Sequence, residues 1–318
     1  VEWSPNSYEA QNIPVDTGIR RSNRIADRTQ RAHNFCAMQF LANDPENVKD
    51  AMSSNYSGEW KLAMKEEIDS LTANKTWVLT DLPPGEKAVK SKWVFKTKRD
   101  EEGNAIRWKA RLVAKGFSQR EGIDFTETFA PVVRYVSIRY LLALAVKHNM
   151  FIHQMDAVSA YLNGTLKETV YMQQPDMFED GSRKVCKLYK SIYGLKQSGR
   201  VWNETINSEL IKMGLVRGEV DQCIYQKVTD GQMLYVAIYV DDVLIFSNNL
   251  KSIESIKKKL AIIFKMKDMG EVSSVLGMKI TRGENFIKVD QAQYISDVLV
   301  RFGMNESNPT TTPIDYNQ

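Results

Sequence analysis

Two neighbouring carboxylates, Asp241 and Asp242, interrupt two apolar, β-rich runs at 234–240 and 243–246. Two uncompensated charges inside a sheet would cost several kcal/mol each, so the pair is expected at the turn of a hairpin. A third carboxylate, Asp156, ends an earlier apolar run. Carboxylates on the ends of neighbouring antiparallel strands would offer the hard oxygen ligands that Mg²⁺ prefers. Two such ions could activate a 3′-hydroxyl and stabilise a leaving pyrophosphate. An ordinary polar turn is the alternative for Asp241 and Asp242 alone.

The elements that would hold these carboxylates combine helices with hairpins. Apolar residues recur at helical spacing in five stretches, which predicts helices over 60–71, 138–145, 202–213, 253–263 and 290–302. Apolar or alternating runs predict strands over 77–79, 92–98, 106–115, 151–156, 170–172, 234–240, 243–246, 275–280 and 286–289. Because helices and hairpins follow one another without regular strand–helix alternation, the predicted fold class is α+β.

A strongly basic hairpin precedes the carboxylates. Its strands, 92–98 and 106–115, flank a turn rich in acidic residues, glycine and asparagine. By strand alternation, Lys92, Lys96 and Lys98 share one face of the outgoing strand, and Lys109, Arg111, Val113 and Lys115 share one face of the returning strand. A solvated charged face is one interpretation of this hairpin.

Composition excludes several other classes of protein. The 318 residues are 43% hydrophobic and 26% charged, with a formal net charge of +4, which is typical of a globular protein with mild affinity for polyanions. No apolar run approaches the ~20 residues that cross a bilayer, and no secretory leader is recognised, so neither a membrane partner nor secretion is expected. The three cysteines are widely spaced, which argues against a disulfide scaffold or a zinc knuckle and for a reducing compartment.

From about residue 45 onward, the sequence resembles the reverse transcriptases of copia-type LTR retrotransposons. Six segments carry the resemblance, in the order typical of that family: WVFK at 93–96, WKARLVAKGF at 108–117, ETFAPV at 127–132, QMDAVSAYLNG at 154–164, LYKSIYGLKQS at 188–198 and YVDD at 239–242. Any one of them is a weak signal, whereas the ordered set is specific.

The resemblance implies a right-hand polymerase fold with fingers and palm subdomains, an antiparallel palm sheet and a truncated thumb or connection. Residues 1–45 would be a disordered basic linker that trails an integrase region. Residues 46–285 would form the fingers and palm of the reverse transcriptase. Residues 286–318 would begin the thumb or connection, and the ribonuclease H domain is expected to be absent.

The resemblance also implies catalytic and metal-binding roles for Asp156, Asp241 and Asp242, of which Asp242 is the less direct ligand. Tyr161 matches the aromatic residue that lies under the sugar of the incoming nucleotide and excludes a ribose 2′-hydroxyl. Its alternative is an ordinary core tyrosine. Gln197 matches a residue that contacts the incoming base and sugar, and an exposed glutamine at a helix start is its alternative.

Further nucleotide-binding candidates are Lys98, Lys109 and Arg111, which would clamp the triphosphate. Gly277 and Met278 resemble the primer grip, where a small hairpin holds the 3′ end of the primer. Either Lys265 or Lys267 would match the lysine that protonates pyrophosphate.

The implied function is RNA-directed DNA polymerisation with Mg²⁺, or Mn²⁺, as cofactor. The expected partners are an RNA or DNA template with its primer, deoxynucleoside triphosphates and other parts of the same polyprotein. The expected location is a cytoplasmic virus-like particle, with a nuclear step also open. A catalytically silent protein that only binds nucleic acid is the alternative.

Overall fold

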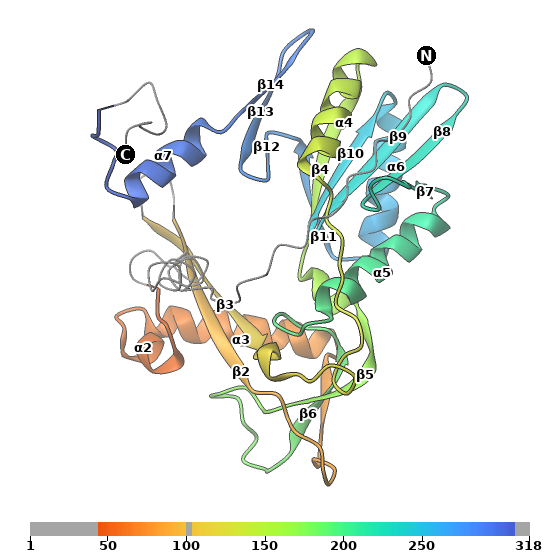
Figure 1. Ribbon diagram of the computed structural model, residues 1–318. Helices are drawn as coiled ribbons and strands as arrows, with labels where there is room; N and C mark the ends of the chain where they lie inside the picture. Colours follow the sequence, from red (N-terminus) through yellow and green to blue (C-terminus); the bar gives the residue numbers. More distant parts are fainter. Residues whose placement is uncertain (1–43, 100–103, 309–318) are drawn as a thin grey trace, which may run out of the picture.

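The computed structural model describes residues 44–99 and 104–308 (Figure 1). Its buried side chains form two clusters. The first, here called the N-terminal core, is built from α2 (Val48–Ser53), α3 (Ser57–Ala73), β1 (Trp77–Thr80), β2 (Ser91–Arg99), β3 (Ala105–Ala114), β5 (Thr165–Met172) and β6 (Val185–Lys190). Packing between α3 and the β2–β3 hairpin holds this core together, with Trp60 edge-on to Phe95 at 5.2 Å between ring centroids.

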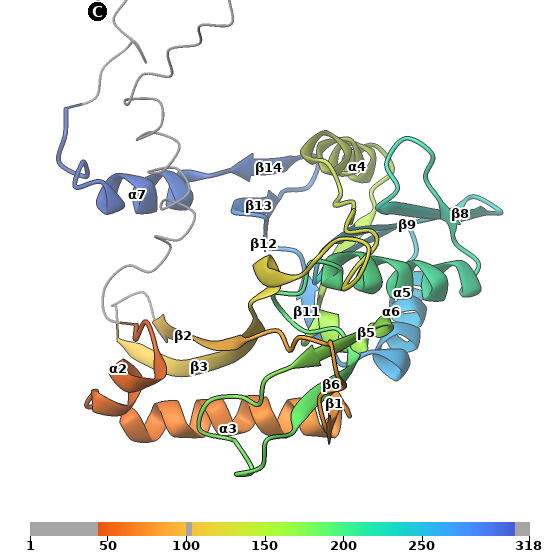
Figure 2. The same ribbon diagram turned by 60° about the horizontal axis from the view of Figure 1, so that its bottom comes forward.

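The second cluster, here called the sheet core, surrounds a six-stranded antiparallel sheet with the order β11-β4-β10-β9-β8-β7. Its strands are β4 (Phe151–Ala157), β7 (Val216–Arg217), β8 (Ile224–Thr229), β9 (Gln232–Tyr239), β10 (Asp242–Ser247) and β11 (Met266–Glu271). The helix α4 (Tyr135–Lys147) lies on one side of this sheet, and α5 (Ser198–Lys212) and α6 (Leu250–Ile263) lie on the other (Figure 2).

The remaining elements follow the sheet core along the chain. A three-stranded sheet has the order β12-β13-β14, and its strands are β12 (Ser274–Val275), β13 (Met278–Arg282) and β14 (Ile287–Asp290). The last helix, α7 (Ala292–Arg301), extends away from both cores (Figure 1). Two short 3₁₀ helices, η1 (Gly116–Ser118) and η2 (Ala160–Asn163), lie after β3 and β4.

The predicted α+β class is confirmed, because helices alternate irregularly with sheets whose strands pair antiparallel. The predicted basic hairpin is β2–β3, although its turn at 100–103 lies outside the described residues. Asp156 is the penultimate residue of β4 rather than its last. None of the helices in the described ranges is long and apolar enough to cross a membrane. The predicted linker at 1–45 lies almost wholly outside the described residues.

Two chain segments interlock at the N-terminal core, to which Ala114 and Leu195 both belong. The Ala114 N–H donates to the carbonyl oxygen of Tyr193 at 2.8 Å. Gly194 has a φ of +92°, and a Cβ on it would lie 2.0 Å from the Ala114 carbonyl oxygen. Only glycine permits both that backbone conformation and that approach, so the end of β3 and the loop before α5 are fixed to one another.

Candidate active site

A cleft of about 470 Å³ lies between the two cores. Its lining combines acidic, basic and aromatic side chains from α3, β2, β3, β4 and the segment after it, the β9–β10 turn, the loop before α5 and β11. The residues are Glu67, Val94, Lys96, Lys98, Arg107, Lys109, Arg111, Asp156, Ala157, Val158, Ser159, Tyr193, Asp241, Lys267 and Met269. Both carboxylate strands and the basic hairpin therefore reach the same space.

The three predicted carboxylates come together at one end of the six-stranded sheet. Asp156 on β4 is the direct cross-strand partner of Asp242 on β10, so their side chains leave the same face. Asp241 lies in the β9–β10 turn and lines the cleft with Asp156. Asp242 does not line it, and its Oδ1 accepts a hydrogen bond from Gln154 Nε2 at 2.8 Å. Two of the three carboxylates thus line the cleft, and the third lies next to Asp156 on the neighbouring strand.

The charges of these carboxylates affect one another. Burial raises the pKa of Asp242, and the negative charges of Asp241 and Asp156 raise it further, against the hydrogen bond from Gln154. Such crowding of carboxylates favours a bound cation, and their oxygens suit Mg²⁺. Within the described ranges, however, no three histidine, cysteine or acidic side chains are arranged so that they would hold a metal ion together. The predicted three-carboxylate cage is accordingly present only as a cluster of neighbours.

The turn that carries Asp241 has an unfavourable backbone. Val240 has a φ of +55°, a region that β-branched residues rarely adopt. Its carbonyl oxygen accepts a 2.7 Å hydrogen bond from Nε1 of the buried Trp202 on α5. The Asp241 carbonyl oxygen accepts another, from the Ala157 N–H at 2.8 Å. These bonds from α5 and β4 hold the strained turn in place.

The opposite side of the cleft is the basic wall, which consists of Lys96, Lys98, Arg107, Lys109 and Arg111 on the β2–β3 hairpin. Lys96 pairs with Lys109 and Lys98 with Arg107, so the basic faces predicted for the two strands lie on the same side of the hairpin. Burial lowers the pKa of Lys109, and the charges of Arg111 and Lys98 lower it further. An anion bound between these cations would relieve their repulsion.

Tyr161 and Gln197 were predicted to contact the incoming nucleotide, but neither side chain lines the cleft. Tyr161 lies behind Tyr193, with ring centroids 4.6 Å apart, and only Tyr193 lines the cleft. Gln197 is fully buried rather than exposed: its amide accepts from Gln119 Nε2 and donates to the Asp124 carbonyl oxygen, both at 3.0 Å. Sequence reasoning missed Tyr193, which has no local signal beyond the glycine that follows it.

Only one of the two lysines predicted to protonate pyrophosphate lines the cleft. Lys267 on β11 lies directly across from Asp156 and lines the cleft, whereas Lys265 does not line it. At the predicted primer grip, Leu276 and Gly277 both have positive φ, 51° and 73°, as a tight turn between β12 and β13 requires. Met278 is buried in the sheet core, whereas Gly277 is exposed at the turn.

Comparison with known proteins identifies the family. Residues 74–316 match the family described as reverse transcriptase (RNA-dependent DNA polymerase). The chain belongs to this family. A solved structure of apo telomerase from Candida tropicalis, truncated from its C-terminal domain, aligns with 73% of this chain and 60% of its own at 11% identity. Its TM-score of 0.40 is too low to inform the site.

Relatives of this reverse transcriptase domain confirm the predicted resemblance to copia-type transposons. The Retrovirus-related Pol polyprotein from transposon TNT 1-94 of Nicotiana tabacum is 41% identical over 85% of this chain and 21% of its own length. The Pol polyproteins from transposons RE1 and RE2 of Arabidopsis thaliana are 38% and 34% identical, over 80% and 98% of this chain. This chain matches 18% of the RE1 polyprotein and 21% of the RE2 polyprotein, so it spans about a fifth of the length of these relatives.

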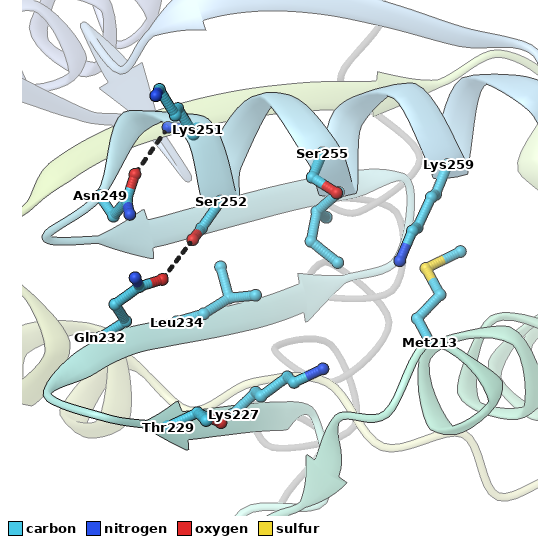
Figure 3. Close-up of a pocket in the computed structure, with 11 residues that line it drawn as sticks. Met213, Lys227, Thr229, Gln232, Leu234, Asn249, Lys251, Ser252, Ser255 and Lys259 are labelled. Atoms are coloured by element: carbon cyan, nitrogen blue, oxygen red, sulfur yellow. Dashed lines mark hydrogen bonds between the residues drawn. The ribbon is translucent and has the colours of Figure 1, made fainter.

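This reverse transcriptase domain has a second hollow, of about 380 Å³, between α6 and the β8–β9 hairpin (Figure 3). Lys227 and Lys259 extend toward its Met213 side, next to Leu234 (Figure 3). None of its lining residues is acidic, histidine or cysteine, so it offers a metal ion no strong ligand. The carboxylate-lined cleft is therefore the better candidate for the active site.

Proposed function

We propose that the chain is the RNA-directed DNA polymerase part of a copia-type Pol polyprotein. In this proposal it adds deoxynucleotides to the 3′-hydroxyl of a primer paired with an RNA or DNA template. The observation that carries the proposal is a single cleft in which Asp156 and Asp241 face the basic wall. Membership of the reverse transcriptase family supports it independently.

The subdomains of the proposed polymerase follow from the two cores. Residues 46–285 would comprise fingers and palm, with the N-terminal core and its basic wall as fingers and the six-stranded sheet as palm. Residues 286–318 would begin the thumb or connection. The position of the cleft between the two cores supports this division.

The proposed chemistry is phosphoryl transfer that depends on position and charge. Asp156 and Asp241 would hold Mg²⁺ or Mn²⁺, and Asp242 would be a less direct ligand. When bound, such ions promote ionisation of the 3′-hydroxyl and neutralise phosphate charge. Lys98, Lys109 and Arg111 would bind the triphosphate oxygens. Lys267, across from Asp156, is placed to donate a proton to the leaving pyrophosphate.

The proposal also assigns roles to the turn at Gly277 and to Gln197. The turn at Gly277 would support the primer 3′ end through its backbone. Because the Gln197 amide is engaged by Gln119 and Asp124, we assign it to holding the loops beside the nucleotide rather than to the nucleotide itself.

Primer extension on an RNA template tests the proposal. Wild-type protein is expected to extend the primer with deoxynucleotides and Mg²⁺, and EDTA or Asp241→Asn is expected to abolish extension. Asp230→Asn is the matched control, since Asp230 lies in the β8–β9 turn and does not line the cleft. A folded wild-type protein that binds primer–template without extending it would contradict the polymerase and favour the silent binding protein.

A further inference from the structure

The hollow beside α6 is basic and lies apart from the cleft. Its charged lining residues are all lysines, Lys227 on β8 and Lys251 and Lys259 on α6, and the rest of its lining is uncharged. Figure 3 shows Lys227 and Lys259 extending into the hollow from opposite walls. Among the described residues, none lines both the hollow and the cleft. The hollow is therefore a separate place where positive charges converge.

The lysines of the hollow have no acidic partner in the part of the chain that the structure describes. No ion pair there includes Lys227, Lys251 or Lys259. Lys257, on the same helix, is by contrast buried and paired with Asp268 at 2.7 Å. Like charges that share one space repel each other, so an anion bound between the lysines of the hollow would be favourable.

The uncharged lining suits a phosphate that is attached to an apolar ring. The hydroxyls of Thr229 and Ser255 have no hydrogen-bond partner among the described residues. Leu234 and Ile256 are buried and Met213 is half-buried, so part of the lining is apolar. Lysine binds phosphate as a point charge, whereas planar carboxylates favour the arginine fork, and the hollow has no arginine. A nucleotide combines the phosphate and the ring.

The basic surface continues along α6 past the hollow. A neighbouring hollow of about 440 Å³ shares Lys251 and Ser255 with it and adds Lys258, with Glu254 as the acidic member of its lining. A free nucleotide carries its phosphates at one point, whereas a strand carries one at each nucleotide and can follow such a surface. The extended basic surface consequently favours a strand as the occupant.

The hollow and the cleft lie at opposite ends of the β9–β10 hairpin. Leu234 pairs with Ser247 at the open end of the hairpin, and Asp241 lies in its turn. At about 3.3 Å per residue, roughly 20 Å of strand separates Leu234 from Asp241. A nucleic acid strand long enough to cover that distance could reach both places, and binding at one would raise its effective concentration at the other.

We propose that the hollow beside α6 binds one nucleotide of a single-stranded RNA, with its phosphate between Lys227 and Lys259 and its base against Leu234 and Ile256. A base in the hollow cannot be paired, so the strand there is single. The site goes beyond the proposed polymerase chemistry, because it holds the strand away from the groups that would react.

The test measures the Kd of the full chain for a fluorescently labelled oligouridylate by anisotropy at several salt concentrations. Lys227→Gln/Lys259→Gln is expected to raise Kd by roughly tenfold at low salt. The slope of log Kd against log salt should become shallower by at least about 0.7, the value for one lost phosphate contact to a single strand. Ser255→Glu adds a carboxylate to the hollow and should also raise Kd.

The matched control removes the same charge elsewhere. Lys61 on α3 and Lys147 on α4 are exposed and line neither the hollow nor the cleft, so Lys61→Gln/Lys147→Gln should retain most of the wild-type affinity. Photocrosslinking with RNA that contains 4-thiouridine locates the strand directly, and mass spectrometry should place crosslinks on α6 or the β8–β9 hairpin. Circular dichroism establishes that each variant is folded.

The other outcomes overturn the inference. Equal losses of affinity in the two double variants would mean that overall charge attracts RNA, and crosslinks confined to the cleft would place the strand only there. If Lys227→Gln/Lys259→Gln lost affinity for uridine 5′-triphosphate but kept its affinity for RNA, the occupant would be a free nucleotide rather than a strand. A wild-type protein that extends no primer but shows the expected loss of RNA affinity would contradict the polymerase alone and support this site.

Discussion

At the scale of single residues, the strained Val240 links the core to the candidate chemistry. A β-branched residue at positive φ is unfavourable by about 1–3 kcal/mol and persists only where its surroundings impose it. Trp202 on α5 helps to hold this conformation, because its Nε1–H donates a hydrogen bond to the Val240 carbonyl oxygen. Because Asp241 is the next residue, the position of a cleft carboxylate depends on a buried indole.

Replacing Trp202 with phenylalanine should therefore affect both stability and activity. Trp202→Phe keeps most of the packing against Phe264 but removes the donor, so the free energy of unfolding should fall by about 1–3 kcal/mol. Primer extension should slow because the turn is no longer held. Urea unfolding and extension kinetics measure the two effects.

The control is Trp77→Phe in β1, away from the cleft, where the same loss of ring size should leave the extension rate unchanged. If Trp202→Phe extends primers as fast as Trp77→Phe, the bond to Val240 has no part in positioning Asp241.

How far the site could be predicted from sequence depends on whether a residue has a local signal. Asp156 and Asp241 lie at breaks in apolar runs, and Lys109 lies in an alternating basic strand; each is found in the cleft. Tyr193 could not be predicted, because a close approach between Gly194 and Ala114, 80 residues apart in sequence, brings it there. The burial of Gln197 could not be predicted either, because its hydrogen-bond partners lie on a loop that is distant in the sequence.

At the scale of elements, β11 brings Lys267 to the cleft and is held by a small polar cluster. The Lys257 ammonium, which is buried on α6, lies 2.7 Å from both His153 Nδ1 and Asp268 Oδ1. Asp268 follows Lys267 on β11, and His153 lies on β4. The cluster thus joins α6, β4 and β11, and His153 must offer Nδ1 as an acceptor.

This cluster predicts a pH dependence of stability. Burial lowers the pKa of His153, and the charge of Lys257 lowers it further, against the attraction of Asp268, Glu254 and Glu271. Below about pH 6.5 the unfolded chain therefore binds a proton that the folded chain resists, and the free energy of unfolding falls as the pH falls. Denaturant unfolding at a series of pH values measures the slope.

His153→Gln should flatten this dependence between about pH 7 and 5, since glutamine can accept from Lys257 without titrating. His148→Gln, at the C-terminal end of α4, is the control and should keep the wild-type slope. Parallel curves for wild type and His153→Gln would show that the cluster does not resist protonation.

Most elements predicted from sequence have a buried face, but the predicted helix α7 has no buried residue, and β6, with three buried residues, was not predicted. Helices α3, α4, α5 and α6 and the β9–β10 hairpin have clear apolar periodicity, and each is present. No strand was predicted at β8 or β11: four of the six residues of β11 are polar or glycine, all six are at least partly exposed, and its pairing with β4 is irregular between Asp268 and Gly270. Such strands are defined by their neighbours in the sheet rather than by a pattern of their own.

At the scale of the whole molecule, the cleft is lined by two separately packed cores, with the basic wall on one and Asp156 and Asp241 on the other. The basic wall belongs to one core and the carboxylates to the other. Local patterns predict each set, but nothing in a local pattern states that they face one another. Only the order of the family's motifs indicated that arrangement.

The balance of charge across the cleft can be tested with Lys109→Gln. The substitution removes one cation from the basic wall, so the KM for deoxynucleoside triphosphate should rise by roughly tenfold, as expected for a lost charge-assisted hydrogen bond. Burial and the charges of Arg111 and Lys98 disfavour the charged form of Lys109, whereas Glu67 attracts it, so the variant should stay close to wild type in its free energy of unfolding, which urea unfolding measures. Loss of affinity would then not reflect loss of fold.

The salt dependence of KM is the second measurement of this test. Screening weakens the attraction between the basic wall and a triphosphate, so the gap in KM between wild type and Lys109→Gln should narrow as salt is added. Lys147→Gln is the matched control, since Lys147 lies in the last turn of α4 and carries the same charge away from the cleft. A KM that rises equally in both variants would mean that overall charge attracts the nucleotide. A KM that rises only in Lys109→Gln, most strongly at low salt, would tie nucleotide binding to the face opposite Asp156 and Asp241.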